Sequence, residues 1–201
     1  GCGIHLHCFG YGRGQSPVLE ALCKSVTYYP RDISLLRNLS FKPYIVTSRN
    51  SVELARNLSG DNLPILFDGI HTTACLGDPA LSGRMKIVRV HNIEHRYYHT
   101  LGRFEKNLLR KIYFEVEALR LKTYEKVLRH SDILLTVSET DQEYFERKYN
   151  NAELIPSFHP CETVESPEGT GDYIIFHGDL SVNENVVVAE HLITRILSKL
   201  P

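Results

Sequence analysis

Short apolar runs alternate with helix-like stretches along most of the sequence, and this alternation restricts the fold more than any other feature. Runs typical of strands occur at residues 4–9, 25–29, 63–67, 86–90 and 132–137. Strands separated by helices are typical of parallel sheets, because a parallel neighbour can be reached only through a long crossover connection. The sequence therefore predicts an α/β fold built on an open, parallel, Rossmann-like sheet of about five strands.

Serine residues mark three expected helix starts, since a serine hydroxyl caps free backbone N–H groups well. Ser16 precedes Pro17, Ser51 precedes residues 52–58, and Ser138 stands three residues before Asp141 in an arrangement like a capping box. The longest helix is expected at about residues 105–129, where apolar residues recur mostly at spacings of three and four.

Residues 156–171 contain three prolines and two glycines and show little periodicity, which is typical of a linker. A strand at residues 173–176 and a helix at residues 185–200 are expected after it. We therefore predict an acceptor-side domain over residues 1–155, a hinge over 156–171, and the first βα unit of a second Rossmann-like domain over 172–201. Because the sequence opens in a strand and stops at the end of a helix, we expect it to be an internal piece of a longer protein.

The charge and cysteine content narrow the class of protein. A formal net charge of −1 gives no reason to expect a nucleic acid as partner. The five cysteines (Cys2, Cys8, Cys23, Cys75 and Cys161) form no C-x-x-C pair, which fits reduced thiols in a cytoplasmic protein. Residues 96–130 carry nine Lys and Arg against four Glu, so a peripheral contact with the inner face of a membrane is a further expectation.

Polar residues follow several of the expected strands. His71 comes shortly after residues 63–67, His91 directly after residues 86–90, and Ser138 closes residues 132–137. Ligands of open parallel sheets bind beyond the carboxyl ends of the strands. The sequence therefore predicts a site at this edge that includes His71 and His91.

Three other patterns invite different chemistry. His91 to His95 matches H-x-x-E-H, but a zinc site of that type needs both histidines on one helix, and here a strand runs directly into His91. His5 and His7 share one strand face, which suits either packing or a metal. The glycines of residues 10–14 lack the G-K-[ST] ending of a phosphate-binding loop, which favours a turn. We expect no bound metal.

The motifs and their order resemble glycosyltransferase family 4. The resemblance rests on VRVHNIEHRYYHTL (residues 88–101) and EVEALRLKTYEKVLRHSDILLTVSETDQEYF (residues 115–145). The segments LPILFDGIH, ELIPSFHP and FHGDLSVNEN continue it in the family's order. The resemblance covers nearly the whole chain.

Several expectations follow from this resemblance. It implies two Rossmann-like domains facing across a cleft (the GT-B fold) and a retaining transfer of a sugar from a nucleotide-diphosphate donor. The enzyme would be of mannosyltransferase type, with a saccharide or lipid-linked acceptor and no cofactor besides the donor. It implies a catalytic His91; the expected substrate-binding residues are His71, Asn92, Glu94 and Ser138, and the expected donor-binding residues are Gly178 and Asp179.

The sequence departs from the family at the donor side. Many relatives have Arg and Lys where this chain has Asp179 and Glu184, so the donor diphosphate would lack its usual positive partners. The family's first strand and glycine-rich loop would also precede residue 1, and we therefore expect the chain by itself to be inactive. Two alternatives stay open: a nucleotide-sugar 2-epimerase of the same fold, and a non-catalytic sugar-binding or assembly module.

Overall fold

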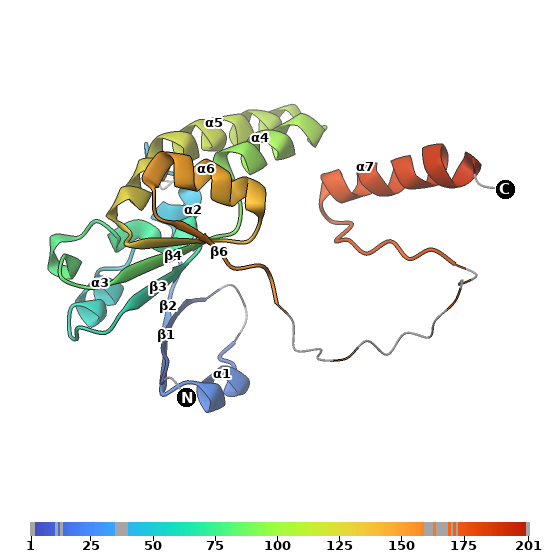
Figure 1. The fold of residues 1–201 in the computed structure, drawn as a ribbon. Coiled ribbons are helices and arrows are strands. Elements are labelled where there is room, and N and C mark those ends of the chain that lie inside the picture. Colours follow the sequence, from blue (N-terminus) through green and yellow to red (C-terminus); the bar gives the residue numbers. More distant parts are fainter. Residues whose placement is uncertain are drawn as a thin grey trace.

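A computed structural model describes residues 3–10, 12, 14–34, 40–158, 163, 169, 171 and 173–199. The chain has an α/β, Rossmann-like fold in which helices pack around parallel strands (Figure 1). Most of the predicted linker, residues 156–171, lies outside the described residues.

The described strands form two parallel sheets. A two-stranded sheet pairs β1 (His5–Phe9) with β2 (Ser25–Tyr29). A four-stranded sheet has the order β3-β4-β5-β6. Its strands are β3 (Ile65–Asp68), β4 (Lys86–Val90), β5 (Ile133–Thr136) and β6 (Ala152–Leu154). The sequence predicted five of these strands but missed β6, whose three residues are too few to show a periodic pattern.

Seven α-helices lie among the described residues. They are α1 (Pro17–Leu22), α2 (Tyr44–Thr47), α3 (Val52–Leu58), α4 (Glu94–Phe104), α5 (Leu108–Tyr124), α6 (Glu139–Tyr149) and α7 (Asn183–His191). The hydroxyls of Ser16, Ser51 and Ser138 each accept a hydrogen bond from the backbone N–H three residues later, as the capping pattern predicted. A π-helical turn, Leu192–Ile196, and a 3₁₀ turn, Leu197–Lys199, extend α7.

The predicted helix over residues 105–129 is α5 followed by a 3₁₀ segment, Glu125–His130. Asn107 caps its start by accepting from the N–H groups of Leu109 and Arg110. The preceding helix α4 was not predicted as a separate helix. It is polar and contains Gly102, which is buried against α5 so closely that a Cβ there would lie 2.8 Å from Glu115 Oε1. Packing of α4 on α5 therefore holds this helix in place.

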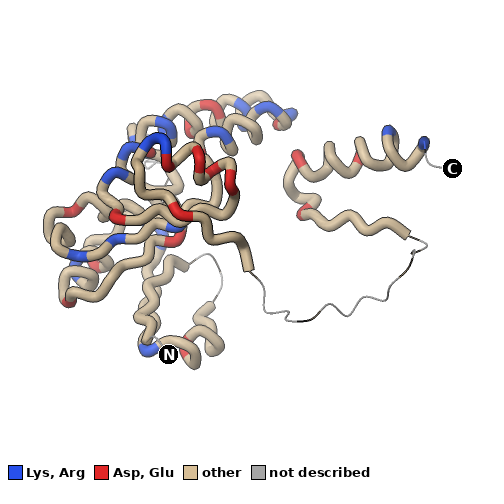
Figure 2. The backbone as a smooth tube through the Cα atoms, viewed as in Figure 1, with Lys and Arg blue, Asp and Glu red and all other residues tan. Residues whose placement is uncertain are grey.

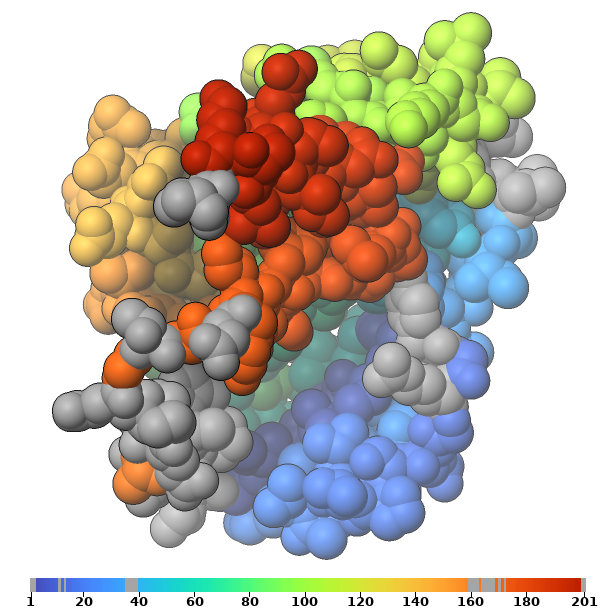
Figure 3. All heavy atoms as spheres, turned by 90° about the vertical axis from the view of Figure 1, so that its right-hand side faces the viewer, coloured from blue at the N-terminus to red at the C-terminus, as the bar shows by residue number. Residues whose placement is uncertain are grey.

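The predicted strand at residues 173–176 is wrong as a sheet strand. These residues pair with no strand in the described chain, and the side chains of Tyr173 and Ile175 are each 76% exposed. An apolar run becomes a strand only where a neighbouring strand accepts its backbone hydrogen bonds. The helical half of the predicted second βα unit is present as α7, which lies beside α4 (Figure 3).

The core lies between the four-stranded sheet and the helices. Val88 of β4 and Leu134 of β5 are fully buried against Leu76, Leu121 and Leu128. In the two-stranded sheet, His5 Nδ1 lies 2.8 Å from Ser25 Oγ and His7 Nδ1 lies 2.7 Å from Tyr29 Oη, so both histidines have partners on β2. Cys8, Cys23 and Cys75 are free thiols. Within the described part of the chain, no helix combines the length and the apolar character that a membrane crossing requires.

Candidate functional site

His91 stands at the carboxyl end of β4, immediately after Val90, as the sequence predicted. Its Nε2 lies 3.0 Å from Oδ1 of Asp68, the last residue of the adjacent strand β3. The two side chains are 37% and 65% exposed, so the pair is open to solvent. A histidine oriented by a carboxylate presents its other ring nitrogen in a fixed direction.

Gly69 brings a second histidine to the same place. It follows Asp68 with φ 92° and ψ 152°, a conformation that is essentially restricted to glycine. A Cβ at this position would lie 2.5 Å from Cε1 of His71 and 3.3 Å from Cδ2 of His91. Both imidazoles therefore pack against the bare face of Gly69, and the predicted juxtaposition of His71 and His91 is present.

The environment of His71 favours its neutral form. Burial is the main reason that the pKa of His71 falls from 6.5 to about 4. The charges of Arg49, His91 and Arg31 act in the same direction, whereas Asp68 opposes the shift. A neutral imidazole carries one donor and one acceptor, both of which can bind a polar ligand.

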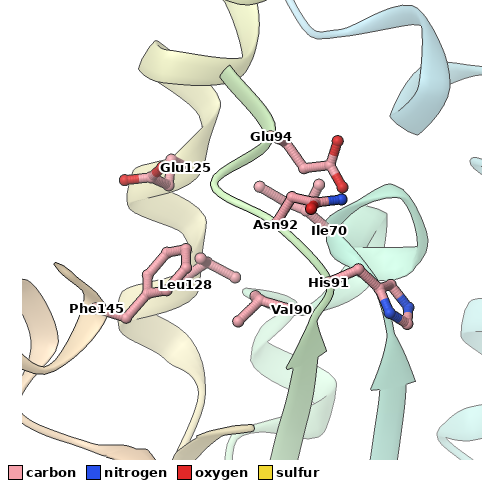
Figure 4. A pocket seen from close by; sticks show the side chains of 8 residues that line it. All are labelled: Ile70, Val90, His91, Asn92, Glu94, Glu125, Leu128 and Phe145. Atoms are coloured by element: carbon pink, nitrogen blue, oxygen red, sulfur yellow. The ribbon is translucent and has the colours of Figure 1, made fainter. Parts of the chain in front are cut away.

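The loop from β4 to α4 adds Asn92 and Glu94. Together with His91, Val90, Ile70, Glu125, Leu128 and Phe145 they line a small cavity of about 10 Å³, the size of one water molecule. Figure 4 shows the side chains of His91, Asn92 and Glu94 extending to one side of this loop, while Glu125 and Phe145 lie on the other side. Burial raises the pKa of Glu94 from 4.5 to about 7.

The buried carboxylate of Glu125 stabilises the loop between β4 and α4. Glu125, whose side chain is 2% exposed, lies 3.0 Å from His95 Nδ1 and accepts hydrogen bonds from Tyr144 Oη at 2.9 Å and from Lys148 Nζ. Burial acts to lower the pKa of Lys148, but its hydrogen bonds to Glu125 and Tyr144 outweigh that and raise it. Because His95 belongs to the first turn of α4, this network fixes the helix that follows His91.

His91 and His95 face different carboxylates, Asp68 and Glu125, and only His95 belongs to α4. The arrangement therefore lacks the shared helical face that an H-x-x-E-H zinc site needs. Among the described residues, no group of three or more His, Cys, Asp or Glu side chains is placed to hold a metal ion.

The other predicted residues lie apart from the histidine pair. Ser138 is at the end of β5, but its hydroxyl caps α6 by accepting from Asp141 N–H at 3.2 Å, so its substrate-binding role stays a prediction.

The predicted donor-binding residues, Gly178 and Asp179, precede α7. Asp179 is exposed, and hydrogen bonds from the Ser181 side chain and from Ser181 N–H, the latter at 2.9 Å, lower the pKa of Asp179. Burial is the main cause that raises the pKa of Tyr97, and the negative charges of Glu184 and Glu94 raise it further. Because such charges act only at short range, the start of α7, which carries Glu184, lies near the loop after β4.

Sequence reasoning missed three participants. Asp68 and Gly69 were seen only as the end of a strand, although a carboxylate at the end of a strand, shortly before His71, could have suggested a charged partner. Glu125 was placed within a motif without a role. Its partner His95 is thirty residues away, and no local pattern links the two.

The chain is similar to one curated protein from Klebsiella pneumoniae, described as an "Uncharacterized 44.6 kDa protein in cps region". The two are 31% identical over 149 residues, which is 71% of this chain and 38% of that protein. The chain thus spans well under half the length of this relative, which comes from a capsule polysaccharide gene region. No family model and no solved structure matches the chain.

Proposed function

We propose that this chain forms the acceptor side of a nucleotide-sugar glycosyltransferase of the family 4 type that acts in polysaccharide biosynthesis. The observation that carries the proposal is the histidine pair packed on Gly69, with His91 held by Asp68, at the carboxyl edge of a parallel sheet. The distant relative from a capsule polysaccharide gene region supports the same biological context.

The geometry suits a group that positions a sugar. When Nε2–H of His91 donates to Asp68, Nδ1 keeps its lone pair and accepts a hydrogen bond from a sugar hydroxyl. His71, neutral because its pKa is about 4, adds one donor and one acceptor beside it. Glu94, with a pKa of about 7, exists in both protonation states near neutral pH and adds a third polar side chain to the site.

In the proposed reaction, the bond between the anomeric carbon and the donor phosphate oxygen breaks, and a bond from that carbon to the acceptor oxygen forms. The proton of the acceptor hydroxyl leaves with the released nucleoside diphosphate, so atoms and charge balance. The transfer retains configuration at the anomeric carbon, in line with the family that the motifs resemble. His91 would act by hydrogen bonding at the reacting sugar, where positioning and polar stabilisation contribute most.

A second candidate is a non-catalytic sugar-binding module. It is favoured by one observation: Asp179, exposed and with a lowered pKa, stands at the turn before α7, where the family that the motifs resemble usually has a cation. A negative charge there repels a diphosphate, whereas a neutral saccharide is unaffected.

The test is a transfer assay with the complete protein that contains this chain, a panel of GDP- and UDP-sugars, and saccharide and lipid-linked acceptors. Release of nucleoside diphosphate together with an acceptor heavier by one sugar supports the transferase. Saccharide binding by calorimetry without turnover would support the module instead. Interconversion of a UDP-sugar in the absence of acceptor would identify a 2-epimerase and overturn the transferase.

A further inference from the structure

Helix α5 has apolar side chains on two opposite faces. One face packs into the core through Ala118 and Leu121, which are 8% and 1% exposed. The other face points to solvent and is defined here as the outer stripe. It consists of Leu108 (69% exposed), Leu109 (78%), Ile112 (52%), Val116 (43%) and Leu119 (67%). Because 108, 112, 116 and 119 follow spacings of four and three, their side chains form one continuous row.

Such a row differs from the scattered exposed apolar residues found on any protein surface. Single exposed leucines are common, whereas a contiguous apolar surface bounded by polar groups marks a contact site. A solvated helix normally buries one apolar stripe and presents polar residues opposite it. We therefore expect another surface to cover the outer stripe.

The charges around the outer stripe are mainly positive. Lys111 and Lys122 are exposed and each follows a stripe residue by three positions, so both line the same edge of the row. At the tip of the hairpin, Arg103 of α4, Lys106 of the turn and Arg110 of α5 are exposed as well. Figure 2 shows this concentration of Lys and Arg along the hairpin of α4 and α5 and at its tip.

Three carboxylates lie near these basic residues, and each already has a partner. Glu105, in the turn between α4 and α5, accepts a hydrogen bond from Asn107 N–H at 2.9 Å. Glu115 is paired with His99 at 2.9 Å, and Glu117 is fully buried beside Arg120 at 2.7 Å. The hairpin also stands at one edge of the molecule, where a flat surface can reach it (Figures 1 and 3).

We propose that the outer stripe binds an anionic membrane surface, with α5 lying in the interface between lipid and water and the basic residues contacting lipid phosphates. Apolar side chains flanked by Lys and Arg are the combination that such interfacial helices use. A second copy of the chain suits the stripe less well, because stacking two stripes would bring Lys111 and Lys122 of both copies together. This proposal does not depend on sugar transfer.

The test is co-sedimentation of the purified protein with vesicles of phosphatidylcholine alone or mixed with phosphatidylglycerol. We expect binding to the phosphatidylglycerol vesicles that weakens with added salt. The double variant Leu109→Asn/Ile112→Asn should lower the partition coefficient about tenfold or more, since it removes two membrane-inserted side chains. The variant Lys111→Gln/Lys122→Gln should lower it about tenfold on anionic vesicles only.

A matched control is Val52→Asn/Arg56→Gln, which changes one exposed apolar and one exposed basic residue on α3 and should leave the partition unchanged. Circular dichroism checks that every variant is folded. Absence of binding to anionic vesicles, or equal binding by stripe and control variants, would overturn the proposal. If the stripe variants instead convert a dimer to a monomer in light scattering without affecting vesicle binding, the stripe belongs to a second copy.

Discussion

The imidazole Nε2 of His91 lies 3.0 Å from Oδ1 of Asp68, across the carboxyl ends of two adjacent parallel strands. In the register of the sheet, Asp68 is paired with Arg89, two residues before His91, so the contact joins residues that the sheet itself places side by side. Neither side chain needs a flexible loop to reach the other. The pair is therefore set by strand register.

Replacing His91 by Ala is expected to lower turnover at least about 100-fold in the proposed transferase, because it removes a positioned polar group at the reacting sugar. Asp68→Asn should cause a smaller loss of about tenfold, since the amide still contacts the ring but no longer favours one tautomer. Steady-state kinetics with the donor and acceptor that the transfer assay selects measure both.

His99→Gln is the matched control for these variants, because His99 forms a similar pair with Glu115 at 2.9 Å on the hairpin of α4 and α5. It should leave turnover within about threefold of the parent value. A loss below about threefold for a folded His91→Ala protein would assign His91 a structural role instead.

Gly69→Ala is expected to destabilise the protein and disturb both histidines. Alanine at φ 92° and ψ 152° is strained, and its Cβ would lie 2.5 Å from His71. We expect the free energy of unfolding to fall by about 2 kcal/mol in urea titrations. Gly83→Ala, where a Cβ meets nothing within 4 Å and φ is not positive, should change it by less than about 1 kcal/mol. Equal effects of the two substitutions would contradict the close packing at Gly69.

The sequence predicted the strands that carry the histidines because each is a short apolar run ended by a polar residue. Strands β2 and β4 match their predicted bounds, Ser25–Tyr29 and Lys86–Val90. The single predicted sheet is instead two sheets in the described residues, since pairing between distant strands leaves no local pattern. Helix α4 was missed for a related reason: its stability comes from contacts with α5.

The candidate site was predictable only in part. His71 and His91 follow from their positions after strands, whereas the network around Glu125 joins side chains from α4, α6 and the segment after α5. Burial of Glu125 results from how these elements pack together. A single sequence shows a glutamate there but not its surroundings.

The Glu125 network gives a stability prediction. Glu125→Gln removes the charge that holds Lys148 and weakens the contacts with His95 and Tyr144, so we expect the free energy of unfolding to fall by about 2–3 kcal/mol. Glu115→Gln is the control, because that carboxylate also pairs with a histidine but is 42% exposed; it should change stability by less than about 1 kcal/mol. Urea unfolding of both variants measures the difference. Similar losses of the free energy of unfolding would show that the buried Glu125 network stabilises the protein no more than the exposed Glu115 pair does.

The last prediction concerns pH and Glu94. Its pKa is raised by burial from 4.5 to about 7, so the folded protein binds this proton more tightly than the unfolded chain does. The resulting stability is fully present below about pH 4.5 and is lost as the pH rises through about 7. Glu94→Gln cannot ionise, so the variant should match the parent near pH 4.5 and exceed it by about 3 kcal/mol near pH 8.5. Unfolding in urea across this range tests it. The titration of His71 occurs in both proteins and cancels in their difference, whereas a difference that is constant with pH would contradict the raised pKa of Glu94.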